Sequence, residues 1–93
     1  MTERIQRVRS QRARDTRTGA EVFNVDREHL GYELGGRVWT LPVERGVGVV
    51  SIYLPDRSAW DDGSAMTPDE VAGARESVEL VLQDWGSRAD FVE

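Results

Sequence analysis

The segment from Thr67 to Gly86 constrains the fold most, because it has every mark of one amphipathic helix. Thr67, Pro68 and Glu70 occupy the positions of an N-cap, a first-turn proline and the glutamate of a capping box. Gly86 suits a helix C-terminus. Apolar residues at helical spacing form a single stripe: Val71, Ala74, Val78, Val81, Leu82 and Trp85. A helix with one apolar face needs a surface to cover, and the rest of the chain must supply it.

Three β-rich runs precede the helix. The first, at 21–25, reads EVFNV, and the polar segment DREH follows it. The second is LGYELGGRVWTLPVE at 30–44, and the third is GVGVVSIYL at 46–54. Apolar and polar residues alternate within these runs, as they do in half-buried strands. The third run is the most hydrophobic, so we expect it in the centre of a sheet.

The second run carries a hairpin signal. Gly35 and Gly36 separate two β-rich halves, and a two-residue hairpin turn favours glycine because it needs positive φ angles. Leu34 and Arg37 would then face each other across the turn.

These elements predict a single domain of the α+β class. The chain has 93 residues, which is enough for one small core. We expect residues 20–93 to form a small antiparallel sheet of three to four strands covered by one long C-terminal helix. The basic N-terminal segment, residues 1–19, fits an exposed strand as well as a helix. We expect it to be an edge strand or mobile.

The charged residues also separate a basic N-terminal segment from an acidic body. Residues 1–17 hold six Arg against Glu3 and Asp15, whereas residues 18–93 hold six Arg against fifteen acidic residues. The acidic body would repel nucleic acid and attract a basic protein, although a net charge of −5 also serves ordinary solubility. We therefore expect nucleic acid to bind, if at all, only through the basic segment.

Several functional classes lack support in the sequence. The chain has no cysteine, no apolar run of membrane-spanning length and no secretory signal, so we expect a cytoplasmic protein that does not bind membranes. His29 is the single histidine, and Asp56, Asp61 and Asp62 lack the spacing of a calcium loop. We expect no enzyme activity, no cofactor and no metal site.

The loop before the helix is open to two interpretations. The start of the helix does not account for the four residues at 60–63, which are Trp60, Asp61, Asp62 and Gly63. Trp60 either plugs the end of the sheet–helix core or stands in an exposed recognition loop of aromatic and acidic side chains.

Three stretches together resemble small bacterial immunity proteins of polymorphic toxin and contact-dependent inhibition systems: GYELGGRVWTLPVE, VVSIYLPDRSAWDDG and MTPDEVAGARESVELVLQDWG. In that group a Tyr-x-x-Gly-Gly-Arg-like hairpin leads into a strand with a Glu near its end, and a loop Trp precedes a capped C-terminal helix. The resemblance covers about residues 31–86; the basic N-terminal segment departs from the pattern. The matching positions are Tyr32, Gly35, Gly36, Arg37, Glu44, Trp60 and the helix from Pro68.

The resemblance implies a non-enzymatic protein that binds and neutralises a cognate bacterial toxin. Its acidic body would suit a basic toxin or nuclease. We expect Trp60 to anchor the partner, with a charged surround from Asp56, Asp61 and Asp62. Glu76 and Glu79, on the open face of the helix, come second.

Other functions fit the same residues. A phage or mobile-element inhibitor of a host nucleic-acid-guided defence complex would need the same size and acidity. A small ligand-binding domain or enzyme would instead need a concave pocket with convergent polar groups. An exposed strand edge would also permit a homodimer.

Overall fold

The computed structural model describes residues 3–93, which form seven strands and one helix. The strands pair in chain order, and every pair is antiparallel except β6 with β7, which is parallel. In chain order, the elements are β1 (Ile5–Arg9), β2 (Arg12–Asp15), β3 (Glu21–Asp26), β4 (His29–Leu34), β5 (Arg37–Arg45), β6 (Val49–Tyr53), α1 (Pro68–Asp84) and β7 (Arg88–Val92).

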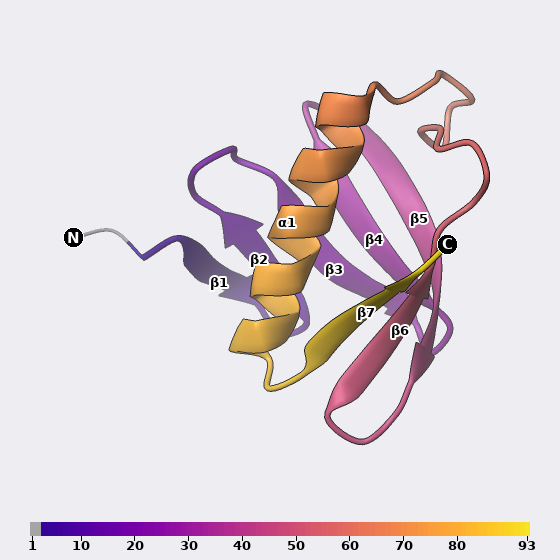
Figure 1. The fold of residues 1–93 in the computed structure, drawn as a ribbon. Coiled ribbons are helices and arrows are strands. Elements are labelled where there is room, and N and C mark those ends of the chain that lie inside the picture. The colour runs from indigo at the N-terminus through magenta and orange to yellow at the C-terminus, as the bar shows by residue number, and fades with distance from the viewer. Residues whose placement is uncertain (1–2) are drawn as a thin grey trace.

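The sheet curls into a half-barrel, and α1 lies across its concave face (Figure 1). The helix connects β6 to β7, and this crossover allows the last two strands to run in parallel. Alternate side chains of the strands point inward against one face of the helix. The largest part of the core consists of Ala13, Val22, Leu30, Tyr32, Trp39, Leu41, Val43, Val50, Ile52, Ala74, Val78, Val81 and Leu82.

The predicted fold class was wrong. A small antiparallel sheet of three to four strands under one long helix was expected, whereas the protein is mostly sheet, with seven mixed strands that curl around one short helix. The additional strands are β1, β2 and β7. Residues 12–15 read RARD, so the inward positions of β2 hold only an alanine and an aspartate. A strand with so little apolar content gives almost no periodic signal.

The hairpin at Gly35 and Gly36 is confirmed. Both glycines have positive φ, and Leu34 pairs with Arg37 in the register of β4 and β5. The third run forms β6, which lies one strand from the edge and not in the centre of the sheet.

The helix start is confirmed in detail. The Thr67 Oγ1 accepts the Glu70 N–H at 3.1 Å, and a Glu70 carboxylate oxygen accepts the Thr67 N–H at 2.8 Å. Pro68 is the first helical residue, and Gly86, with φ of +85°, follows the C-cap residue Trp85. This helix, the one found within residues 3–93, is neither long nor apolar enough to cross a membrane.

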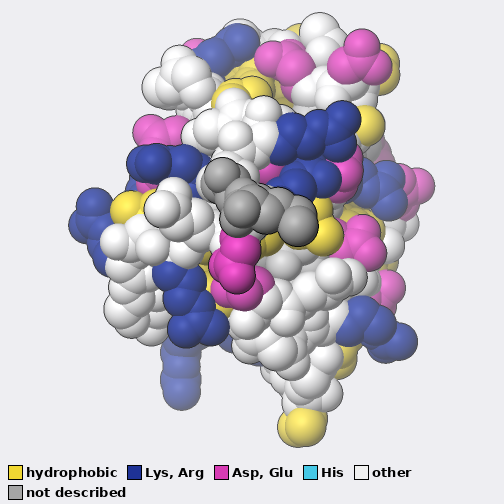
Figure 2. Space-filling model, turned by 90° about the vertical axis from the view of Figure 1, so that its left-hand side faces the viewer, with side chains coloured by type: hydrophobic (Ala, Val, Ile, Leu, Met, Phe, Trp, Pro, Cys, Tyr) yellow, Lys and Arg dark blue, Asp and Glu magenta, His cyan; other side chains and the backbone are white. Residues whose placement is uncertain are grey.

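The N-terminal segment is attached to the helix through Asp15 and Arg4. Asp15 is fully buried at the inner side of β2. Arg4 donates two hydrogen bonds of 3.0 Å to its carboxylate, and the Ser77 hydroxyl of α1 donates a third at 2.6 Å. Arg4 also binds Glu76 at 2.9 Å. Figure 2, which looks at the N-terminal side, shows arginines and carboxylates intermixed on this face.

Candidate functional site

Trp60 belongs to the loop between β6 and α1, and its side chain is part of the core. Its side chain is only 2% exposed, and its ring stacks on Tyr32 with the centroids 6.1 Å apart. The guanidinium of Arg37 lies 5.0 Å from the Trp60 ring centroid. Its indole N–H has no hydrogen-bond partner among the described residues. The ring therefore plugs the end of the core, as the first of the two interpretations has it, and presents no surface to a partner.

The two aspartates after Trp60 are exposed and fixed in position. Asp61 accepts the Thr40 N–H at 2.9 Å and the Thr40 hydroxyl at 2.5 Å, and its own N–H donates to the Val38 carbonyl at 2.8 Å. Asp61 thereby continues the pairing of β5 beyond the end of β6. Asp62 accepts hydrogen bonds from the hydroxyl and N–H of Ser64, which lower the pKa of its carboxyl.

The other predicted residues lie in two places. Asp56 is exposed in the same loop as Asp61 and Asp62. Glu79 is exposed on α1, and Glu76 faces the N-terminal strands, where it binds Arg4 and lies 3.8 Å from Arg17. The structure therefore gathers the three aspartates in one loop and places Glu76 elsewhere.

The convex face of the sheet carries a feature that the sequence analysis missed. His29 pairs with Pro42, and Tyr53 pairs with Val92. The register of β5 and β6, in which Val43 pairs with Ile52, brings Pro42 beside Tyr53. His29, Pro42, Tyr53 and Val92 thus form one row across β4, β5, β6 and β7. The last three are exposed; Tyr53 is 40% and Val92 37% accessible.

Carboxylates flank this row on both sides. Glu44 and Asp90 both pair with Ser51, one from each neighbouring strand, so they lie on the same outer face. The Tyr53 hydroxyl donates to Glu44 at 2.7 Å, and this bond raises the pKa of Tyr53. On the other side lies Asp61, bonded to Thr40 two residues before Pro42. We call the row and its three flanking carboxylates, Glu44, Asp61 and Asp90, the convex patch.

A shallow groove of about 730 Å³ lies at one end of the convex patch. His29, Pro42, Glu44 and Tyr53 line it, and Arg27 also borders it. The Nδ1 of His29 lies 2.8 Å from Asp26, and residues 3–93 contain no group of three side chains suited to a metal ion. The arrangement offers contact surface and charge.

One signal in the sequence pointed to part of this surface. The alternation within 46–54 separates Tyr53 from the buried Val50 and Ile52. The neighbours of Tyr53 could not be found in the same way, because β7 was not expected and pairs with β6 only through the crossover.

Comparison with known proteins identifies no relative. No family model matches the sequence, no curated protein does, and no solved structure matches the fold. The resemblance to immunity proteins therefore stays a prediction.

Proposed function

We propose that this chain is a non-enzymatic binding protein whose convex patch contacts a basic protein partner. The observation that carries the proposal is the row of exposed side chains, Pro42, Tyr53 and Val92, with carboxylates on both sides. The outward face of an antiparallel sheet is normally polar where it meets water. An apolar centre with a charged rim is instead the anatomy of a protein interface, in which tyrosine often supplies much of the binding energy.

The charge of the chain supports a basic partner. The net charge is −5, and Glu44, Asp61 and Asp90 surround the apolar row. Complementary charge speeds the encounter of two proteins and disfavours acidic competitors.

Among basic partners, a bacterial toxin that acts in the same cytoplasm is our first candidate, with this chain as its immunity protein. This part rests on the resemblance described above. Of the residues that carry the resemblance, Glu44 lies in the convex patch, whereas Tyr32 and Trp60 are buried and support the fold. A phage-encoded inhibitor of a nucleic-acid-guided defence complex would use the same surface, and the identity of the partner distinguishes the two.

The test begins with the tagged chain and a lysate of its own host, followed by affinity measurements on the captured protein. Tyr53→Ala combined with Val92→Ser should weaken binding at least about ten-fold, because it removes the apolar centre. Glu44→Gln with Asp90→Asn should mainly slow association at low salt. Val47→Ser is the matched control, since Val47 is fully exposed in the β5–β6 turn, outside the convex patch.

Two results would count against the proposal. The first is a stoichiometric partner whose affinity does not change in the Tyr53 and Val92 variant, shown to be folded by near-ultraviolet circular dichroism. The second is the absence of any captured protein in lysates of hosts that express their toxins. Capture of an acidic partner would disprove the charge argument but leave the apolar contact to be tested.

A further inference from the structure

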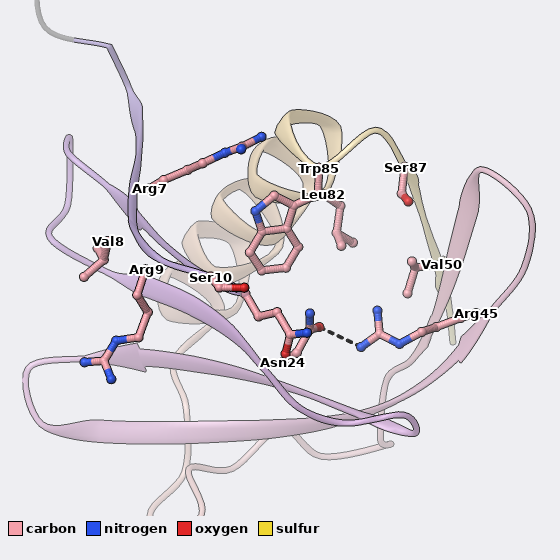
Figure 3. A pocket seen from close by; sticks show the side chains of 11 residues that line it. Arg7, Val8, Arg9, Ser10, Asn24, Arg45, Val50, Leu82, Trp85 and Ser87 are labelled. Carbon is pink, nitrogen blue, oxygen red and sulfur yellow. Dashed lines mark hydrogen bonds between the residues drawn. The ribbon is translucent and has the colours of Figure 1, made fainter.

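A second cavity, of about 710 Å³, opens at the end of the half-barrel where α1 ends. It lies between the turn that joins β1 to β2, the ends of β3 and β5, and the start of β6. Its walls include Arg7, Ser10, Asn24, Arg45, Trp85 and Ser87. Figure 3 shows the Trp85 ring in the middle of the pocket, with Arg7 on one side and Arg45, bonded to Asn24, on the other.

Positive charge in this pocket is only partly neutralised. Arg45 donates to the Asn24 side-chain oxygen at 2.7 Å, to the Arg27 carbonyl at 3.2 Å and to the Asp26 carbonyl at 3.5 Å. All three acceptors are neutral, so they orient the guanidinium without compensating its charge. No carboxylate of the described residues lies within ion-pair distance of Arg45 or Arg9. These arginines present positive charge and hydrogen-bond donors on a chain whose net charge is −5.

Arg7 adds further donors at the same site. Its Nε donates to Asp84 at 3.3 Å, and this is its one ion pair with the residues that the structure describes. Within residues 3–93, no hydrogen bond joins its two terminal nitrogens to a carboxylate. Arg9 also lines the pocket, although its guanidinium points away from Trp85 in Figure 3. The lining itself contains no carboxylate.

Most of the terminal carbonyl groups of α1 have backbone partners. The carbonyl groups of Val81, Leu82 and Gln83 already accept backbone hydrogen bonds from Trp85, Gly86 and Ser87. The negative end of the helix dipole is therefore partly satisfied within the chain, and it opposes an anion less than an open helix end would.

Trp85 gives the pocket a flat apolar surface. Its side chain is only half-buried, although it belongs to the apolar stripe of the helix, and Val50 and Leu82 line the pocket beside it. Aromatic rings of ligands stack on such surfaces, and the side chains of Ser10, Asn24 and Ser87 offer hydrogen bonds around them.

From these features we infer that the pocket binds a small ligand in which a flat ring carries an oxyanion, phosphate or carboxylate. The ring would stack on Trp85, and the oxyanion would take charge-assisted hydrogen bonds from Arg45 and Arg7. The volume is within the range of small-molecule sites. Arg45 also lines the groove at one end of the convex patch, but the inference does not depend on the proposed partner binding.

Isothermal titration calorimetry at low salt tests the inference with two probes. Adenosine 5′-monophosphate represents the phosphate source and salicylate the carboxylate source; adenosine and inorganic phosphate test the ring and the anion separately. We expect at least one of the two probes to bind more tightly than adenosine or phosphate alone. The probe that binds identifies the source of the oxyanion.

Variants connect the binding to the pocket. Arg45→Gln should weaken the bound probe about ten-fold or more, because it removes a charged hydrogen-bond donor. Trp85→Leu should weaken it too, by loss of stacking, and thermal unfolding checks that both variants fold. Arg57→Gln is the matched control: Arg57 is an exposed loop arginine without an ion pair among the described residues, outside the pocket, and the substitution changes the net charge equally.

The inference is overturned if neither probe binds. It is also overturned if Arg45→Gln and Arg57→Gln weaken binding equally, which would mean a general charge effect. Equal binding of inorganic phosphate and of adenosine 5′-monophosphate would exclude the contribution of the ring.

Discussion

Asp15 is a fully buried carboxylate that the structure keeps ionised. Burial by itself raises the pKa of Asp15, but hydrogen bonds from Arg4, from Ser77 and from the Arg17 N–H outweigh it, and the net pKa is lowered. The same residue ties β2 to β1 and to α1. Asp15 therefore helps to hold the basic N-terminal segment in the fold, together with the pairing of β2 with β3.

The lowered pKa of Asp15 predicts acid sensitivity. A carboxyl that titrates at lower pH in the folded than in the unfolded state contributes stability above its unfolded pKa of about 4. That contribution is lost as the pH falls from there through the folded pKa, because the unfolded chain binds the proton first. We expect the free energy of unfolding to decrease as the pH falls below about 4.

Urea unfolding of the wild type and of Asp15→Asn at pH 7 and pH 3 measures this effect. At pH 7 the variant should be less stable by about 2 to 3 kcal/mol, the typical value of hydrogen bonds to a charged group. The difference should shrink at pH 3. An equal difference at both pH values would show that Asp15 acts through packing and not through its charge.

Gly31 in β4 and Gly73 in α1 differ in whether there is room for a side chain. Gly31 of β4 lies under the Phe23 ring, and a methyl group there would come within 2.4 Å of the ring. Arg12 covers the Phe23 ring, with its guanidinium 4.3 Å from the centroid, so the ring has little freedom to move. Gly73 of α1 has no atom within 4 Å of the same position. The packing of Phe23 on β4 thus requires a glycine at Gly31, whereas α1 does not require one at Gly73.

Alanine at these two positions should act in opposite directions. Gly31→Ala should destabilise the protein by about 1 to 3 kcal/mol through overpacking. Gly73→Ala should stabilise it by up to about 1 kcal/mol, because alanine favours the helix. Thermal or urea unfolding of both variants measures the pair, and a neutral Gly31→Ala would mean that Phe23 is held less firmly than its contacts indicate.

The molecule as a whole depends on both ends of its chain. β1 and β2 close one side of the half-barrel, and β7 closes the other, after the helix has crossed the concave face. β1 and β7 are therefore the two edges at which the predicted homodimer would form. The side of α1 that faces β2 contains the buried Ser77. Its hydroxyl donates a hydrogen bond to Asp15, and this contact accounts for a polar residue on the buried side of the helix.

Deletion of residues 1–16 should disrupt the fold and not merely remove a basic arm. The deletion takes away the buried Ala13 and Asp15 and exposes one face of α1 to water. We expect the truncated chain to lose cooperative thermal unfolding and to bind a hydrophobic dye. A truncated chain that unfolds cooperatively, with near-ultraviolet circular dichroism like that of the full chain, would show that β1 and β2 are dispensable.

The sequence predicted what depends on neighbours along the chain. The capping box at Thr67 and Glu70 and the turn at Gly35 and Gly36 are local arrangements, and each formed as expected. Less of the candidate site could be predicted from the sequence. Asp61 and Asp62 were expected at an exposed surface and are exposed, but the row through Pro42 and Tyr53 joins strands that are distant in sequence.

The sequence by itself determined the helix with its start and end, and the β4–β5 hairpin. These features follow from backbone preferences and from the periodicity of apolar residues within one segment. Only the tertiary structure decided that the basic N-terminal segment forms two strands, that Trp60 lies inside, and that β7 completes the sheet in parallel with β6. In each of these the deciding contact comes from a distant segment: Ser77 and Arg4 for Asp15, Tyr32 for Trp60, and the helix crossover for β7. Contacts of this kind leave no periodic trace in either of the segments that they join.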